Sequence, residues 1–408
     1  MTDTPNRSTG RHADERPVMP EGLPFRQAEE LLHETASRQT GLDDFGDPSY
    51  LEGLRVVLAA YDDEARFTPS GRQLAYGYLV EFLARRLRAQ KLLRDHPESQ
   101  RVEIRRPIVI LGLVRTGSTA LHYLMGQDPQ LQKVEHWLGC HPQPRPPREQ
   151  WADHPDYQAT VAELEAIYRA DPSLKAIHFM TADLPEECRH FMAQCFTDDF
   201  FEVNASIPSY TQWYEARHLS DTYRHHRRLV QLIGLNEPEK RWLLKYPVHM
   251  KNLAALLEVY PDACIVQTHR EPAKVLSSYI SLISGFRSLY ESDIDRDTVA
   301  REQCEVWARG AEHAIEVRRS RDPAQFFDLY FEEFVADPVG SVRRIYEYFG
   351  IDYTDETDRA LRAWQQDNPA GKHGEHRYSF EGVSLEPAQI NERFASYIEY
   401  FDIKTESS

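Results

Sequence analysis

The chain has 408 residues, of which 41% are hydrophobic and 28% are charged, a composition typical of a soluble protein with one large α/β domain or two smaller ones. It carries 48 Lys and Arg residues against 65 Asp and Glu residues, so its formal net charge is −17. This charge opposes non-specific binding to nucleic acid and to anionic membranes. An anionic ligand therefore needs a local cluster of basic residues.

The N-terminal residues 1–22 are polar and contain proline. They lack the apolar segment of a signal peptide, so we expect a disordered tail there. No apolar run approaches the roughly 20 residues that span a bilayer, which predicts a protein without a membrane anchor. The five cysteines show no paired spacing and predict free thiols in a reducing cytoplasm.

Helical periodicity dominates the next segment, where Ala28, Leu31 and Leu32 share one helix face. We predict an N-terminal helical cap region over residues 23–100. An α/β domain is expected over residues 101–404, with a helical insertion at about 151–235.

The stretch 106–125 reads RPIVILGLVRTGSTALHYLM. Its apolar, β-branched part, 107–114, is typical of a strand buried on both faces of a parallel sheet, and a helix is expected from about residue 120. The turn between them presents backbone N–H groups, small hydroxyls and a guanidinium at a helix N-terminus, where the helix dipole favours an anion. The predicted phosphate-binding loop consists of Arg115, Thr116, Gly117, Ser118 and Thr119.

This loop differs from the loop of nucleoside-triphosphate-binding proteins. The spacing of Gly112 and Gly117 is the same, but Ser118 stands where that motif requires Lys. A triphosphate with Mg²⁺ also needs an acidic residue near the end of a neighbouring strand, whereas residues 264–267 lead into Thr-His-Arg. We therefore expect an anion site without a metal, which favours sulfuryl transfer over a kinase reaction.

Between this loop and the next strand, residues 141–147 are rich in proline and predict an extended loop. An amphipathic helix is expected over 156–170. Residues 175–235 are crowded with aromatic side chains and histidines and contain the acidic pair Glu186 and Glu187. We expect this stretch to build a core or to line an acceptor pocket.

Two groups in this stretch raise the question of a metal. Cys188, His190 and Cys195 are zinc-ligand types, but no second closely spaced ligand pair accompanies them, so we expect no metal site. The run 225–228, His-His-Arg-Arg, is more typical of a solvated helix face.

A second basic turn follows further along the chain. Residues 242–245 predict a short strand that ends at Lys245, followed by a helix at about 250–259. The strand predicted at 263–268 leads into Arg270 and a helix that carries Ser278. Because ligands bind at the carboxyl ends of strands in open α/β sheets, two such turns imply a ligand with two separated phosphate groups.

These motifs resemble those of the sulfotransferases that use 3′-phosphoadenosine 5′-phosphosulfate (PAPS). Residues 112–121, GLVRTGSTAL, are similar to the 5′-phosphosulfate-binding loop of that family. Residues 266–278 resemble its 3′-phosphate-binding segment, which assigns Arg270 and Ser278 to that phosphate. Further motifs, which follow the order of the bacterial branch, lie at 245–249, 261–263, 326–334, 337–338 and 371–378. The motif at 326–334 is expected to be a strand.

The resemblance implies a three-layer α/β fold, a P-loop-like parallel sheet flanked by helices, with helical N-terminal and inserted segments. It implies PAPS as co-substrate, no metal, and a small-molecule, lipid or carbohydrate acceptor with a hydroxyl or amine. Lys372 and His373 sit where the family closes a loop over the 3′-phosphate and the adenine. Tyr246 stands where bacterial relatives commonly have Ser.

The chemistry requires a cation at the leaving oxygen and a general base at the acceptor. Lys245 and Arg115 suit the first role. Glu135, His136 and His249 are candidates for the second. We favour Glu135, because a Glu at this distance after the loop is the base in the tyrosylprotein-type relatives.

Two other classes of function remain open from the residues. A small-molecule kinase would share the phosphate loop but needs Mg²⁺ and the missing Lys. A non-catalytic nucleotide-binding protein would keep Arg115 and Arg270 but would need no base.

Overall fold

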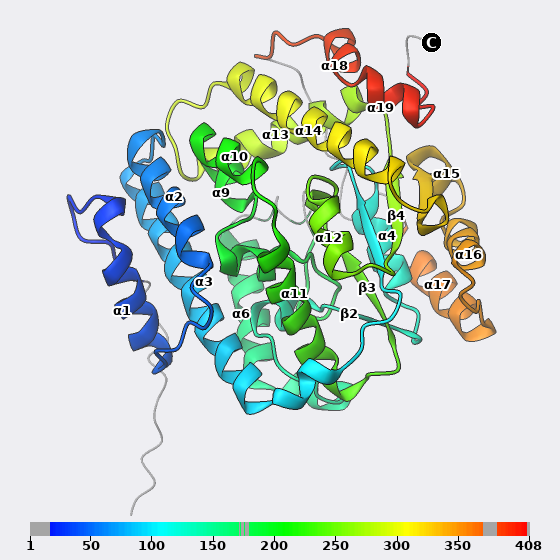
Figure 1. Cartoon of the computed structure of the whole chain (residues 1–408), viewed down its shortest axis with the longest axis horizontal. Helices are drawn as coiled ribbons and strands as arrows, with labels where there is room; N and C mark the ends of the chain where they lie inside the picture. The colour runs from blue at the N-terminus through cyan, green and yellow to red at the C-terminus, as the bar shows by residue number, and fades with distance from the viewer. Residues whose placement is uncertain (1–16, 171, 173–174, 176–178, 370–381, 406–408) are drawn as a thin grey trace, which may run out of the picture.

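The computed structural model describes residues 17–170, 172, 175, 179–369 and 382–405 (Figure 1). Most of the predicted N-terminal tail lies outside these residues, and so do Lys372 and His373. Among the described residues, no helix has the length and apolar content required to cross a membrane. All five cysteines are free and buried, as their spacing predicted.

A five-stranded parallel sheet forms the centre of the described chain, in the order β2-β3-β1-β4-β5. Its strands are β1 (Ile108–Gly112), β2 (Leu131–Lys133), β3 (Arg241–Lys245), β4 (Cys264–His269) and β5 (Phe326–Tyr330). β1 and β4 are buried along their whole length, which explains their continuous apolar runs. The predicted α/β fold with a parallel sheet is confirmed.

The strand order creates a crevice at one point of the sheet. The chain leaves β1 toward β2 on one side of it, and leaves β4 toward β5 on the other side. The connections that follow β1 and β4 therefore diverge at the carboxyl ends of these two neighbouring strands. Ligands bind at such a switch point in open α/β sheets, and both predicted phosphate-binding turns lie there.

Helices cover both faces of the sheet. Ile108 and Ile110 of β1 face a smaller core with α4 (Ser118–Met125), α16 (Pro338–Phe349) and α17 (Asp355–Asp367). Val109 and Leu111 face the larger core, which includes α11 (Ser220–Ile233), α12 (Leu253–Val259) and α14 (Arg296–Arg319). Alternate side chains of one strand thus fill two layers.

The N-terminal segment is helical and packs beside the sheet domain (blue in Figure 1). The long helix α3 begins where the Thr68 side chain accepts a hydrogen bond from the Gly71 N–H and proline occupies the first position. Its buried face joins the larger core. The elements of this segment are η1 (Phe25–Gln27), α1 (Glu29–Thr40), α2 (Tyr50–Asp63), α3 (Pro69–Asp95) and η2 (Pro97–Arg101).

The segment between β2 and β3 is helical, as predicted. Its elements before α11 are α5 (His136–Cys140), η3 (Arg148–Asp153), α6 (Pro155–Ala170), α8 (Arg189–Met192), η4 (Ala193–Cys195), α9 (Phe200–Asn204) and α10 (Pro208–Glu215). The prediction of a solvated face at 225–228 is wrong for its histidines, because His225 and His226 of α11 are both buried. The strongly amphipathic helix turns them inward.

The remaining elements complete the crevice and the C-terminal end. The strand predicted at 326–334 is shorter than expected: β5 ends at Tyr330, and α15 begins at Phe331. Apolar residues at 331 and 334 have helical spacing, which a short apolar run does not distinguish from a strand. The other elements are η5 (Gly234–Asn236), η6 (Pro247–Met250), α13 (Pro272–Ser288), η7 (Pro323–Gln325), α15 (Phe331–Ala336), α18 (Pro387–Arg393) and α19 (Ala395–Tyr400).

Candidate active site

The predicted phosphate-binding loop joins β1 to the N-terminus of α4. Arg115 and Gly117 have positive φ angles of 60° and 83°, and the latter residue is the N-cap of α4. The Thr116 hydroxyl lies 2.7 Å from the Leu113 carbonyl oxygen and 2.6 Å from the Thr268 hydroxyl. The loop is thereby held against the end of β4, with the helix N-terminus at the crevice.

The second turn meets this loop directly. The Arg115 Nε donates a hydrogen bond of 2.9 Å to the hydroxyl of Ser278 on α13. Arg270 Nη1 donates one of 3.2 Å to the Arg115 carbonyl oxygen, and its guanidinium lies 4.1 Å from the centre of the Phe331 ring. The structure thus brings together three residues that sequence reasoning assigned to two different phosphates.

Lys245, at the end of β3, reaches the start of α4. Its Nζ donates a hydrogen bond of 2.9 Å to the Thr119 hydroxyl and forms an ion pair with Glu187. The lysine side chain is only 2% exposed. The Cys188 N–H donates to the Lys245 carbonyl oxygen at 3.1 Å, so the segment that carries Glu187 is fixed to the end of β3.

Sequence reasoning treated Glu187 only as part of a possible acceptor pocket. Its contact with Lys245 joins residues from distant parts of the chain, and no local pattern reports such a contact. One sequence feature could have indicated this ion pair, namely two adjacent glutamates in an aromatic stretch that is typical of a core. A carboxylate in such surroundings needs a charged or hydrogen-bonding partner.

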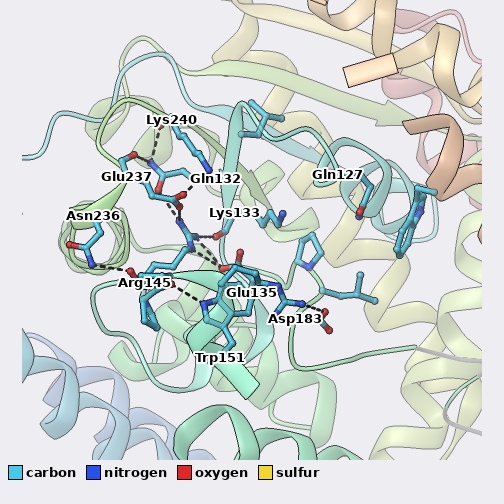
Figure 2. A pocket seen from close by; sticks show the side chains of 17 residues that line it. Gln127, Gln132, Lys133, Glu135, Arg145, Trp151, Asp183, Asn236, Glu237 and Lys240 are labelled. Atoms are coloured by element: carbon cyan, nitrogen blue, oxygen red, sulfur yellow. Dashed lines mark hydrogen bonds and ion pairs between the residues drawn. The ribbon is translucent and has the colours of Figure 1, made fainter. Parts of the chain in front are cut away.

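Glu135 does not contact Lys245 or the phosphate loop in the described residues. It is the N-cap residue of α5, and its Oε2 is 3.1 Å from Nη2 of the buried Arg145. The pair lines a cavity of about 550 Å³ together with Lys133 (Figure 2). Neither Lys245 nor the phosphate loop lines this cavity. No hydrogen bond or ion pair found in the described part of the chain joins Glu135 to them.

A backbone pairing explains this separation. The Glu186 N–H donates to the Val134 carbonyl oxygen at 2.8 Å, and the His136 N–H donates to the Leu184 carbonyl oxygen at 3.0 Å. The inserted segment therefore runs antiparallel to the chain that follows β2. Along this extended chain, successive side chains point to opposite sides, so Glu135 and His136 have different surroundings.

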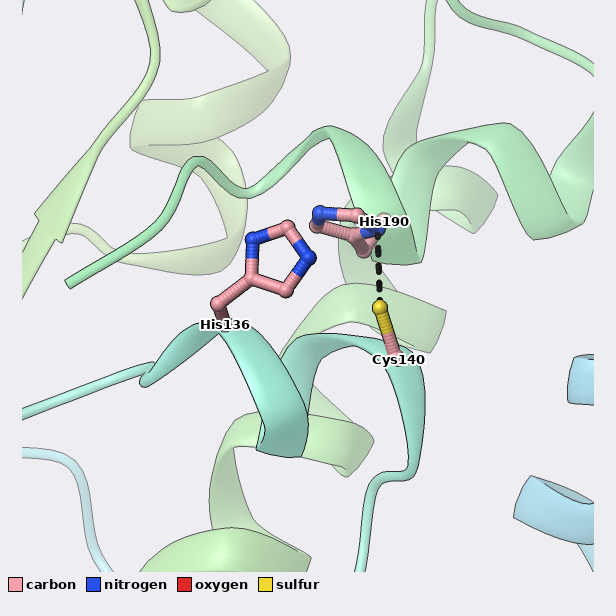
Figure 3. A group of neighbouring side chains, drawn as sticks. All are labelled: His136, Cys140 and His190. Atoms are coloured by element: carbon pink, nitrogen blue, oxygen red, sulfur yellow. Dashed lines mark hydrogen bonds between the residues drawn. The ribbon is translucent and has the colours of Figure 1, made fainter. Parts of the chain in front are cut away.

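His136 forms a group with the buried Cys140 and the half-buried His190 (Figure 3). Its Nδ1 lies 2.9 Å from Glu186 Oε2. Burial opposes protonation of His136, but the Cys140 thiolate and the Glu186 carboxylate outweigh it and raise the pKa to about 10. A protonated imidazole has no lone pair for a proton, so this histidine is poorly suited to be a general base at neutral pH.

His249 is fully buried in η6. Its Nδ1 is 2.8 Å from the Tyr223 hydroxyl, and burial holds its pKa well below the usual range. Its ring contacts are with Tyr223, His226 and Tyr246, all of them buried. Within the described residues it makes no hydrogen bond with the Lys245 side chain or the phosphate loop.

The residue after Lys245 faces a buried acidic pair. The Tyr246 hydroxyl donates a 3.0 Å hydrogen bond to Asp198 Oδ2 and also contacts Asp199. Burial and the neighbouring Asp199 carboxylate raise the pKa of Asp198 to about 8, although Arg189 acts in the opposite direction. Tyr246 is thus held by the inserted segment.

Known proteins resemble this chain in sequence and in fold. A model of the sulfotransferase family matches residues 107–355. The chain belongs to the sulfotransferase family. The match contains the phosphate loop, Lys245 and the second basic turn, so the resemblance inferred from the motifs is confirmed.

Solved structures and a curated relative agree with this assignment. The sulfotransferase STF1 from Mycobacterium tuberculosis H37Rv has a TM-score of 0.85 and 37% identity, over 92% of this chain and 100% of that one. STF9 from Mycobacterium avium has a TM-score of 0.87 and 28% identity, over 95% and 99%. The omega-hydroxy-beta-dihydromenaquinone-9 sulfotransferase Stf3 of Mycobacterium bovis is 26% identical over 273 residues, 64% of this chain and 67% of that protein.

The raised pKa of Asp198 predicts a specific dependence of stability on pH. The unfolded chain loses this proton near pH 4, whereas the folded protein keeps it up to about pH 8. The resulting stabilisation is present at low pH and is lost as pH rises through this window. Asp198→Asn, which cannot ionise, should therefore gain stability relative to the wild type between pH 5 and pH 8.

Urea unfolding at both pH values measures this difference. Asp221→Asn, at an exposed position, controls for the loss of one negative charge. A difference between Asp198→Asn and wild type that is the same at both pH values would contradict the prediction.

Proposed function

We propose that this sulfotransferase transfers the sulfuryl group of PAPS to a hydroxyl of a small-molecule or lipid acceptor by an in-line reaction with a general base. The observation that carries the proposal is the junction of two basic turns at the switch point of the sheet. There Arg115 contacts Ser278 and Arg270. A donor with phosphates at both ends of one nucleoside fits such a pair of turns.

The cations and hydrogen-bond donors of the two turns match the two anionic ends of PAPS. The N-terminus of α4 and the Arg115 guanidinium suit the 5′-phosphosulfate, and Arg270 with Ser278 suits the 3′-phosphate. The contact of the Arg270 guanidinium with the Phe331 ring holds its plane in place before binding. By resemblance to the family, Lys372 and His373 would close over the 3′-phosphate and the adenine. PAPS supplies an activated sulfuryl group, and no metal is required for its transfer.

Lys245 is proposed to stabilise the leaving phosphate oxygen. Its Nζ reaches the N-terminus of α4, where it donates a hydrogen bond to Thr119. There it can leave Glu187 and contact the negative charge that develops on the cofactor instead. A buried cation acts strongly on such charge, because little water screens it. Hydrogen-bond donors that are already positioned add to the stabilisation without a cost of reorganisation.

We propose Glu187 as the general base. Its ion pair with Lys245 places a carboxylate beside the end of the phosphate loop, where α4 begins. If Lys245 turns toward the leaving oxygen, it would release this carboxylate to take up the acceptor proton. Glu135, which the family resemblance favours, is paired with Arg145 and lines a cavity that Lys245 does not line. It remains the alternative base that the same experiment tests.

The acceptor class and the location are also proposals. The curated relative is named for sulfation of a hydroxylated menaquinone, which supports a hydrophobic alcohol as acceptor here. Most aromatic residues of the inserted segment belong to the larger core, among them Phe191, Phe196, Phe201 and Tyr210, so of the two roles expected for this stretch they build the core. Five free cysteines fit a reducing cytoplasm.

Cofactor binding provides the first test. PAPS and its desulfated product, at about 100 times their Kd, should stabilise the native state by about 2.7 kcal/mol, seen as a raised Tm in a thermal shift assay. ATP with Mg²⁺ should stabilise it much less, because Ser118 replaces the lysine that a triphosphate needs. Equal stabilisation by ATP with Mg²⁺ would point to a kinase. Release of the desulfated product with a panel of alcohols, phenols and glycans then identifies the acceptor.

The two cationic roles predict different kinetic effects. Arg270→Ala should weaken PAPS binding by about 10- to 100-fold, because it removes charge-assisted hydrogen bonds present in ground and transition states alike. Lys245→Ala should lower kcat by about 10²- to 10³-fold. Steady-state kinetics at varied PAPS measures both. The exposed Arg301→Ala serves as control, and a Lys245→Ala variant altered only in KM would refute the assigned role.

A matched pair of variants tests the base. Glu187→Gln keeps size and hydrogen bonding but cannot take up a proton, so kcat should fall by about 10²-fold with PAPS binding intact. Glu135→Gln should keep most of the turnover. The reverse pattern would return the role to Glu135.

A further inference from the structure

A second group of potential ligands lies beneath Lys245. Cys188 is the N-cap of α8, His226 belongs to α11, and His249 belongs to η6. All three side chains are buried. One ligand atom of each, the thiol sulfur or a ring nitrogen, lies within 4.8 Å of the others. Three helical elements from distant parts of the sequence thus bring one sulfur and two imidazoles to one point.

Two tyrosines fix the orientation of the imidazoles. The Nδ1 of His226 is 2.8 Å from the Tyr260 hydroxyl, and the Nδ1 of His249 is 2.8 Å from the Tyr223 hydroxyl. With Nδ1 engaged in both rings, the Nε2 atoms are left for other partners. Both are buried and lack a hydrogen bond. An unsatisfied buried polar atom costs about 1–3 kcal/mol, so two in one cluster require an explanation.

The geometry of the two rings suits metal binding. Neutral imidazoles with a free Nε2 lone pair are metal ligands. When each Nδ1–H donates to its tyrosine oxygen, the Nε2 atom carries the lone pair that a metal requires.

We propose that Cys188, His226 and His249 bind a zinc ion through Sγ and the two Nε2 atoms. A mixed sulfur and nitrogen donor set favours Zn²⁺ among common divalent ions. Bond lengths of about 2.3 Å to sulfur and about 2.0–2.1 Å to nitrogen require the ligands to draw slightly closer together, and water completes the tetrahedron. Binding forms the bond to sulfur and releases the Cys188 thiol proton to solvent, with no change in oxidation state.

The other group, His136, Cys140 and His190 (Figure 3), is a poorer candidate. Nη1 of Arg85 lies 3.0 Å from Nδ1 of His190, and this guanidinium repels a metal cation. Arg85 and the two histidines hold the pKa of the Cys140 thiol well below its usual range, against the effect of burial. The thiolate there already has its counter-charges.

The proposed ion would hold the floor of the active site together. It joins the segment that carries Glu187, the η6 turn that follows Lys245, and α11. This inference does not rest on the proposed reaction and revises the expectation that the chain lacks a metal. Sequence reasoning looked for a second closely spaced ligand pair, whereas these three ligands come from separate segments.

Metal content of the full chain tests the proposal without any activity measurement. Protein purified without chelators, loaded with Zn²⁺ and dialysed, should hold about one tightly bound zinc ion per chain by inductively coupled plasma mass spectrometry. After replacement by Co²⁺, the wild type should show a sulfur-to-cobalt charge-transfer band and the intense visible bands of tetrahedral cobalt. A wild-type chain that takes up neither ion would overturn the proposal, whatever the variants do.

Matched variants assign the ligands. Cys188→Ser should lose the charge-transfer band, and His226→Gln should lower zinc content at least about tenfold. Cys140→Ser, in the other cluster, and His225→Gln, the buried neighbour on α11, should keep the metal. Loss of zinc in Cys140→Ser but not in Cys188→Ser would also overturn the proposal.

Discussion

The contact between the phosphate loop and β4 is the constraint on which the site depends. A side chain at Gly112 would place its Cβ 2.4 Å from the Thr268 carbonyl oxygen, so only glycine lets β1 and β4 approach this closely. The hydroxyls of Thr116 and Thr268 then meet at 2.6 Å. This approach holds the start of α4 over the second turn, so that Arg115 reaches Ser278 and Arg270 reaches the Arg115 backbone.

The basic residues of this acidic chain are organised before any ligand binds. Arg270 lies against an aromatic ring, and Lys245 is paired with Glu187. Burial of an unpaired cation is costly, and a buried pair offsets that cost only with good geometry. Glu187 therefore makes a buried Lys245 tolerable in the absence of an anion. On the proposed reaction, an incoming phosphosulfate would replace one negative partner of Lys245 by another, so the buried cation would stay compensated.

Sequence reasoning identified the features that are local. Continuous apolar runs identified β1, β3 and β4, and the turns after them predicted the loop residues that meet at the crevice. β2 was not predicted because Leu131–Lys133 is too short for a pattern. The burial of His226 was missed although the amphipathic pattern of α11 carries it. The pairing of Lys245 with Glu187 was missed because it depends on how the inserted segment returns to the sheet, and the hydrogen bond from Glu186 to Val134 that fixes this return has no local signal.

Buried hydrogen bonds hold the chain that follows β3, residues 245–249, against the inserted segment. Residues 245–249 are held on one side by the Asp198 contact of Tyr246 and on another by the Tyr223 contact of His249. The Cys188 N–H holds the Lys245 carbonyl oxygen itself. A backbone fixed by such buried bonds has little conformational entropy left to lose when a ligand binds. If Lys245 acts as proposed, its side chain exchanges partners at the crevice while its own backbone stays in place, the arrangement that stabilisation of a leaving oxygen requires.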